Sequence, residues 1–74
     1  KEYGKAIEFY SKALAINPVA YPAAYYNLAL LLAQEKKFQQ AIYNMKKYLL
    51  LAPDAPDARA AQDKIYAWEA EQKD

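Results

Sequence analysis

A stretch of 13 residues recurs 35 residues further along the chain. Residues 6–18 read AIEFYSKALAINP and residues 41–53 read AIYNMKKYLLLAP, with Ala, Ile, Lys, Leu and Pro at identical offsets. A period in this range is typical of stacked helix pairs, because each pair leaves an apolar flank that the next pair covers. We therefore expect the chain to be a short stack of helices built from one repeated unit.

Composition favours helices along the whole chain. Val and Thr, two residues that favour strands, are represented by Val19 alone, whereas Ala is the most frequent residue. The chain is 55% hydrophobic and 26% charged, which is the balance of a folded domain. We predict an all-α fold without a sheet, and at 74 residues a core too small to enclose a deep cavity.

The four prolines divide the chain into helical segments. Proline breaks a helix interior but is tolerated in the first turn, so Pro22 is expected to begin the second helix. Asp54 or Asp57 is expected to accept the first free N–H groups of the fourth helix. The predicted helices are residues 2–16, 22–34 and 38–51, and a fourth that follows the PDAPD stretch and reaches about Lys73.

The spacing of the apolar residues assigns a buried stripe to each helix. The second helix is apolar almost all round, so more than one of its faces must be covered. Among the tyrosines, packing is expected for Tyr10, Tyr25 and Tyr66, and a more exposed position for Tyr21, Tyr26 and Tyr43. The candidate core residues of the other helices are Ala6, Ile7, Tyr10, Ala13, Leu14 and Asn17, then Phe38, Ala41, Ile42, Met45, Leu49 and Leu50, then Ala58, Ala61, Ile65 and Trp68.

The chain lacks the side chains that most enzymes use. There is no His and no Cys, Ser11 is the only serine, and no Gly-rich loop could hold a phosphate. The one carboxylate cluster, Asp54, Asp57 and Asp63, lies at the expected start of a helix, where capping is the simpler role. We therefore expect a protein that is not an enzyme and that uses no cofactor and no metal.

Charge and hydropathy disfavour nucleic acid and membranes as partners. The net charge is +1, and RNA-binding helical repeats need a continuous basic face, although two pairs of lysines do lie near Tyr43 and Tyr48. The longest apolar run, residues 28–33, is far shorter than the roughly 20 residues that span a bilayer. We expect no nucleic acid and no membrane insertion.

Residues 25–32, YYNLALLL, resemble the first-helix motif of the tetratricopeptide repeat. Tyr25 stands for the Trp of that motif, Leu28 for its Leu, Ala29 for its Gly and Leu32 for its Tyr. The second half of the motif matches in both copies of the repeated unit. Its matching residues are Ala41, Met45 and Pro53 in one copy and Ala6, Tyr10, Ala13 and Pro18 in the other.

The resemblance implies antiparallel helix hairpins stacked as a right-handed solenoid of about four helices. Residues 1–18 would be the second helix of a truncated repeat, 22–55 a complete repeat, and 56–74 a C-terminal capping helix. The chain departs from the motif at Tyr48, where a small residue is usual, at an insertion near Val19, and at Lys36, where Gly is usual. The first two departures suggest local repacking.

By the same resemblance the protein is an adaptor or scaffold that binds a peptide or helical segment of a partner protein in a concave groove. Asn27 matches an Asn that grips the ligand in many relatives, but the second helix has no Lys or Arg for a carboxylate clamp. An apolar or helical ligand suits Tyr26 and Leu30 better. These two side chains could instead contact only a neighbouring helix, and Asn27 could simply bond backbone groups. The residues implied to bind the partner are Ala23, Tyr26, Asn27, Leu30, Ala33 and Gln34.

A second function is left open by the start of the chain, which falls in the middle of a repeat. The first helix would then lack its usual neighbour and would expose an apolar face. Small chains with such faces commonly pair as symmetric dimers. The alternative function is therefore self-association into a homo-oligomer, with or without exchange of helices, through the exposed faces of the first two helices.

Overall fold

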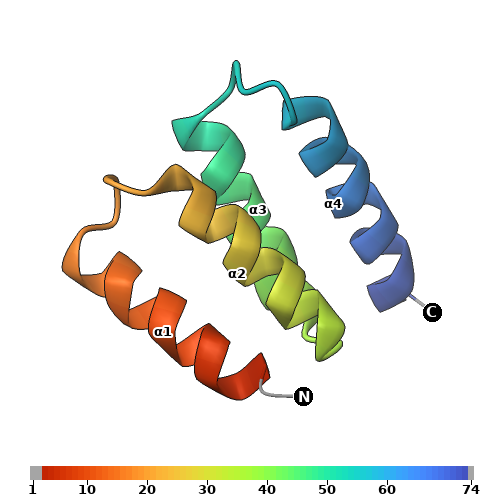
Figure 1. Ribbon diagram of the computed structural model, residues 1–74. Coiled ribbons are helices and arrows are strands. Elements are labelled where there is room, and N and C mark those ends of the chain that lie inside the picture. Colours follow the sequence, from red (N-terminus) through yellow and green to blue (C-terminus); the bar gives the residue numbers. More distant parts are fainter. Residues whose placement is uncertain (1–2, 74) are drawn as a thin grey trace.

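The structure is a computed structural model that describes residues 3–73, and these residues form four α-helices (Figure 1). The prediction of an all-α chain is confirmed. The bounds of α2 and α3 agree with those predicted, whereas the predicted start of the first helix at residue 2 lies outside the described residues. The helices are α1 (Tyr3–Ile16), α2 (Pro22–Gln34), α3 (Phe38–Leu51) and α4 (Ala58–Lys73).

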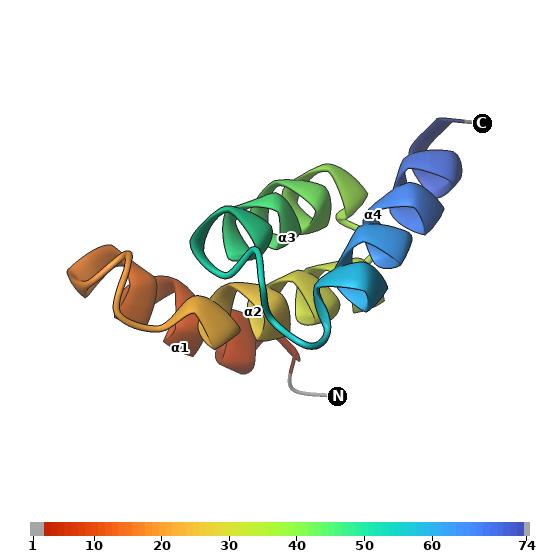
Figure 2. The same ribbon diagram turned by 90° about the horizontal axis from the view of Figure 1, so that it is seen from above.

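Each helix packs against the next one in the chain and runs antiparallel to it (Figures 1 and 2). The stack measures 35 × 31 × 16 Å, so it is a slab rather than a sphere. Helices α2 and α3 lie in its middle, with α1 on one side and α4 on the other. The two outer helices therefore leave more of their surface open than the inner pair does.

The core contains small residues on neighbouring helices together with two large side chains. Ala29 of α2, Ala41 of α3 and Ala61 of α4 are fully buried, which allows close approach of the helix backbones. Met45 and Ile65 are the largest fully buried side chains. The motif residues Tyr25, Leu28, Ala29 and Leu32 are all buried in α2, as the repeat pattern predicts.

Three predicted core positions are wrong. Leu50 is 76% exposed, because the buried stripe of α3 continues from Met45 to Tyr48, and Leu50 lies two residues and thus about 200° beyond Tyr48. Tyr66 is 61% exposed because it follows the buried Ile65 by one residue, which turns it about 100° away from the core. Asn17 is exposed beyond the last residue of α1.

The link between α2 and α3 ends α2 with a Schellman motif. The Lys37 N–H donates to the Leu32 carbonyl and the Lys36 N–H donates to the Ala33 carbonyl, each at 2.9 Å. Lys36 has a φ of 61°, in the left-handed region that Gly adopts most easily. At the position where the repeat motif has Gly, Lys36 therefore adopts the left-handed backbone conformation.

Two tyrosines fasten the other links to the stack. The Tyr25 hydroxyl donates to the Pro18 carbonyl at 2.8 Å and holds the link between α1 and α2. The Tyr48 hydroxyl donates to Asp57 Oδ1 at 2.5 Å and holds the link between α3 and α4. Asp54 or Asp57 was expected to accept the first free N–H groups of α4. In the structure the Asp57 carboxylate accepts the Tyr48 hydroxyl, and only the Asp57 main-chain carbonyl accepts an N–H of α4, that of Ala61.

Candidate functional site

The six residues expected to bind a partner lie on the side of α2 that faces away from Tyr25, Leu28 and Leu32. Their exposure differs along the helix. Three of them are half-buried and pack against the core, namely Tyr26, Leu30 and Ala33. The other three are exposed, namely Ala23, Asn27 and Gln34.

Tyr26 belongs to the packing between helices. Its ring meets the ring of Tyr48 of α3 edge to face, with the ring centroids 5.1 Å apart and the planes at 78°. Such a pair is worth about 1 kcal/mol beyond the area that it buries. The hypothesis that this side chain serves to contact a neighbouring helix therefore describes Tyr26 better than a role as a free anchor for a ligand.

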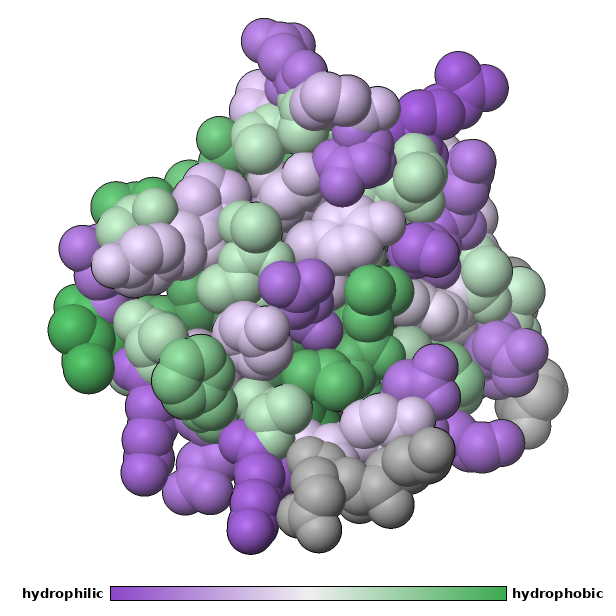
Figure 3. Space-filling model, in the orientation of Figure 1, coloured by the Kyte–Doolittle hydropathy of each residue, from purple (hydrophilic) through white to green (hydrophobic). Residues whose placement is uncertain are grey.

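Asn27 and Leu30 lie beside α1, where two open clefts lie next to each other. A cleft of about 300 Å³ brings Asn27 and Leu30 together with Tyr10 of α1. A second cleft, of about 420 Å³, lies between Asn27, Tyr21 and the Phe9 side of α1. In the orientation of Figure 1, Figure 3 shows apolar side chains gathered over α1 and α2. Asn27 is thus a polar group at an otherwise largely apolar surface.

Ala33 and Gln34 lie at the other end of α2, beside α4. Together with Trp68 of α4 they line an open cleft of about 430 Å³, and Lys36 and Glu71 place charges of opposite sign at it. Asn27 and Leu30 on the one hand, and Ala33 and Gln34 on the other, therefore line separate clefts on the two sides of α2. A segment that touched all of them would have to cross α2.

Several residues of these clefts were not predicted from the sequence. Phe9, 68% exposed, and Tyr21, 59% exposed, line the cleft beside α1, and Trp68 and Glu71 line the cleft beside α4. A signal for Phe9 was present, because it lies with Ala6, Ala13 and Ile16 on one stripe of α1. Trp68 was predicted to be a core residue of the fourth helix. It is half-buried against the core and also lines the cleft beside α4.

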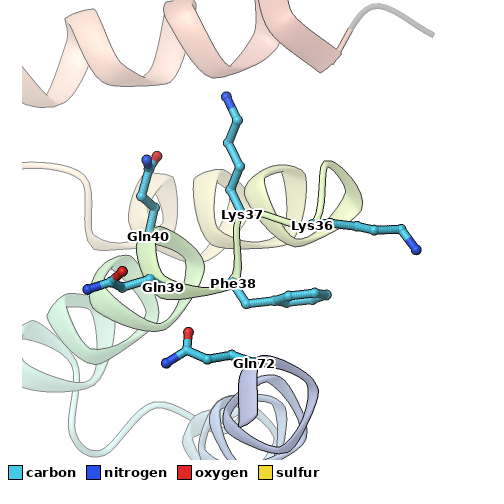
Figure 4. A pocket seen from close by; sticks show the side chains of 6 residues that line it. All are labelled: Lys36, Lys37, Phe38, Gln39, Gln40 and Gln72. Atoms are coloured by element: carbon cyan, nitrogen blue, oxygen red, sulfur yellow. The ribbon is translucent and has the colours of Figure 1, made fainter. Parts of the chain in front are cut away.

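A further open cleft lies at the end of the stack where α2 turns into α3 (Figure 4). It measures about 380 Å³, and its walls include Lys36, Lys37, Phe38 and Gln72 of α4. Figure 4 shows the side chains of Lys36 and Lys37 pointing away from each other. These cations do not converge on a common point, so the cleft lacks the geometry of an anion site.

The strongest electrostatic feature lies outside these clefts, at Tyr48. Its hydrogen bond to Asp57, with burial as a second cause, raises the pKa of the Tyr48 phenol to about 12. Within residues 3–73 no group of three or more His, Cys, Asp or Glu side chains could hold a metal ion. No helix in the described part of the chain is long and apolar enough to cross a membrane.

Comparison with protein families gives a match to a repeat family. The model of the tetratricopeptide repeat matches residues 1–19 and 22–55. The matched ranges contain α1, α2 and α3, and α4 lies beyond them. Searches of curated proteins and of solved structures found no match.

Proposed function

The chain belongs to the tetratricopeptide-repeat family, whose members are generally protein–protein interaction modules, and on that premise we propose a non-catalytic adaptor that binds a segment of a partner protein along α2. In this proposal residues 1–18 form the second helix of a repeat, 22–55 a complete repeat and 56–74 a capping helix. Asn27 and Leu30 are the centre of the proposed binding site. Of the other four expected residues, Tyr26 packs on Tyr48, and Ala33 and Gln34 line a separate cleft.

The observation that carries the proposal is the position of Leu30. It is a half-buried aliphatic residue on the open side of α2, at a cleft, next to the exposed amide of Asn27. An apolar contact bordered by one amide can bury a side chain of a partner segment while bonding its backbone. The charges at the second cleft, from Lys36 and Glu71, have opposite signs and favour no strongly charged ligand.

The test is a selection of binding peptides from a random peptide library displayed on phage, with the chain as bait. The selected peptides are then titrated against Leu30→Glu and against Leu50→Glu. Leu50 is 76% exposed on α3, so this control makes the same substitution away from α2. Circular dichroism establishes that both variants are as helical as the parent chain.

We expect peptides whose affinity falls at least tenfold on Leu30→Glu and is unchanged on Leu50→Glu, because a buried carboxylate without a partner is costly. A second variant, Asn27→Ala, should weaken binding by about fivefold, since one hydrogen bond contributes about 1 kcal/mol. Peptides that bind the parent chain and Leu30→Glu equally well would refute the proposed site. Failure to select any peptide would refute the adaptor function.

A further inference from the structure

Helix α3 carries a stripe on its outer side that combines exposed apolar side chains with cations. Tyr43 is 60% exposed and Leu50 is 76% exposed, and they lie on one side of the helix, about 10 Å apart along its axis. Lys46 and Lys47 lie between them on the same side. We call these four residues the α3 outer face. Figure 2 shows that no other helix in the described part of the chain covers the side of α3 that faces away from α2.

The internal repeat shows that the fold does not require apolar side chains on this face. Helices α1 and α3 contain the two copies of the recurring stretch, 35 residues apart. At the positions of Tyr43 and Leu50, α1 carries Glu8 and Ala15, which are both exposed. Because α1 packs without a large apolar residue at either position, packing does not explain Tyr43 and Leu50. Large apolar side chains that packing does not need, placed together on an exposed stripe, indicate an interaction surface.

The same comparison shows that this face stays open in a longer stack. Helix α1 is followed by the pair α2 and α3, and yet its four equivalent residues remain exposed. Those residues of α1 are Glu8, Ser11, Lys12 and Ala15. A further helix pair after α4, stacked in the same way, would therefore leave the α3 outer face exposed too. In the other direction, α1 and α2 separate α3 from any helix that precedes them.

The charge of this part of the chain indicates which partner suits the face. Residues 36–53 contain four lysines and no acidic residue. Lys47 has no ion-pair partner among the described residues, and its ammonium group lies 5.5 Å from the centre of the Tyr43 ring. Lys46 pairs with Glu69 of α4 at 3.9 Å, and its side chain stays 61% exposed, so this pair contributes little. Both cations are therefore available to carboxylates of a partner.

We propose that the α3 outer face binds an acidic amphipathic helix of a partner protein. Two aliphatic side chains of that helix, spaced like Tyr43 and Leu50, cover these two residues, because the same helical rise separates both pairs. Two adjacent carboxylates between them meet Lys46 and Lys47. A nucleic acid suits the face less well, because two lysines neutralise few phosphates and Leu50 offers no ring on which a base could stack. This surface is separate from α2, and the proposal does not rest on the function proposed above.

The test uses a synthetic peptide of alanine and glutamine, about 20 residues long so that it is helical alone. Near its middle it carries two leucines seven residues apart, with two adjacent glutamates halfway between them. This pattern reads the same in both directions, so this glutamate probe suits either orientation on α3. A second probe replaces both glutamates with glutamine and keeps the leucines. Each probe carries a fluorescent label, and fluorescence anisotropy measures its binding to the chain.

We expect saturable binding of the glutamate probe and binding about fivefold weaker for the glutamine probe, because ion pairs at a surface contribute modestly. Lys47→Glu should weaken the glutamate probe at least tenfold, since attraction becomes repulsion, whereas Lys12→Glu should not. Lys12 is the exposed equivalent of Lys47 in α1, so both variants change the net charge equally.

The apolar part of the face is tested by Tyr43→Ser. This variant should weaken both probes about fivefold, because it removes apolar contact area and no charge. The matched control is Tyr66→Ser on α4, since Tyr66 is 61% exposed and Tyr43 is 60% exposed. Circular dichroism establishes that all variants are as helical as the parent chain.

Three outcomes would overturn the proposal. Absence of saturation by the glutamate probe up to about 1 mM would show that the face binds no such helix. Equal losses on Lys47→Glu and Lys12→Glu would show an unspecific effect of charge. A single-stranded oligonucleotide that binds more tightly than the glutamate probe, and is lost on Lys47→Glu, would assign the face to nucleic acid.

The two proposed surfaces are told apart by Leu50→Glu. This variant should weaken the glutamate probe at least tenfold, because it places a carboxylate opposite a leucine of the probe. Peptides that lose affinity on Leu30→Glu should keep it on Leu50→Glu. Failure of one proposal therefore leaves the other standing.

Discussion

Lys36 holds a backbone conformation that its side chain disfavours. A non-glycine residue at φ 61° costs on the order of 1 kcal/mol, because its Cβ crowds the following carbonyl. We predict that Lys36→Gly raises the free energy of unfolding by roughly 0.5–1 kcal/mol relative to Lys36→Ala, which keeps the Cβ. Urea denaturation followed by circular dichroism measures the difference.

The neighbouring residue supplies the control for this prediction. Lys37 has a φ of −92°, where a side chain causes no backbone strain. Gly therefore relieves nothing at this position and only increases the conformational entropy of the unfolded chain. Lys37→Gly should therefore be less stable than Lys37→Ala, by roughly 0.5–1 kcal/mol. If Gly and Ala differed in the same direction at both positions, strain at Lys36 would not be the cause.

Tyr48 joins α3 to the link before α4 through its hydroxyl. Removing that hydroxyl in Tyr48→Phe should lower the free energy of unfolding by about 1 kcal/mol at neutral pH, because the bond to Asp57 is lost while the ring still packs on Tyr26. Tyr43→Phe is the control, since Tyr43 lies on the same helix and is 60% exposed. A loss as large in Tyr43→Phe would exclude the hydrogen bond as the cause.

The same hydroxyl makes stability depend on alkaline pH. The pKa of the Tyr48 phenol is raised from 10.0 to about 12 in the folded chain, so folding favours the protonated form. The contribution of this group is therefore full below pH 10 and is lost as pH rises from 10 toward 12. Over that range the parent chain should lose more unfolding free energy than Tyr48→Phe does, in denaturant titrations at each pH. Parallel curves for the two proteins would contradict the raised pKa.

At the level of elements, α4 is held by a narrow stripe. Ile65 is 1% exposed and follows the fully buried Ala61 by one turn, whereas its neighbour Tyr66 points to solvent. Ile65→Ala should lower the free energy of unfolding by about 3 kcal/mol through lost burial and the cavity that it leaves. Tyr66→Ala should change it by no more than about 0.5 kcal/mol. If thermal or urea unfolding showed similar losses of stability for Ile65→Ala and Tyr66→Ala, the buried stripe of α4 would be assigned to the wrong residues.

The bounds of the helices could be predicted because proline acts locally. Pro22 fixes where α2 begins, and Pro53 and Pro56 keep the chain from continuing α3, whatever the helices pack against. The buried stripe of α3 was less predictable, because Tyr48 and Leu50 are both large and apolar enough to be core residues. The Tyr48 hydroxyl bonds Asp57, which lies in the link before α4. The sequence of α3 alone therefore does not predict this contact.

The candidate site was predictable only in part for a similar reason. The resemblance to the repeat, combined with helix geometry, implied which side of α2 binds. Asn27, Leu30, Ala33 and Gln34 of that side line clefts. Which cleft each residue joins depends on the neighbouring helices, α1 for Leu30 and α4 for Ala33. The position of Tyr26 depends on Tyr48, a departure from the repeat motif, so the motif alone could not show that Tyr26 is used in packing.

For the whole molecule, the slab shape leaves an outer helix weakly held. Leu14 is the only buried residue of α1 within the described chain, whereas α2 contributes five buried residues and α3 four. Helix α1 is therefore expected to open before the inner pair, and its amide hydrogens should exchange faster than those of α3 when the chain is dilute. Equal protection of α1 and α3 at low concentration would contradict this order.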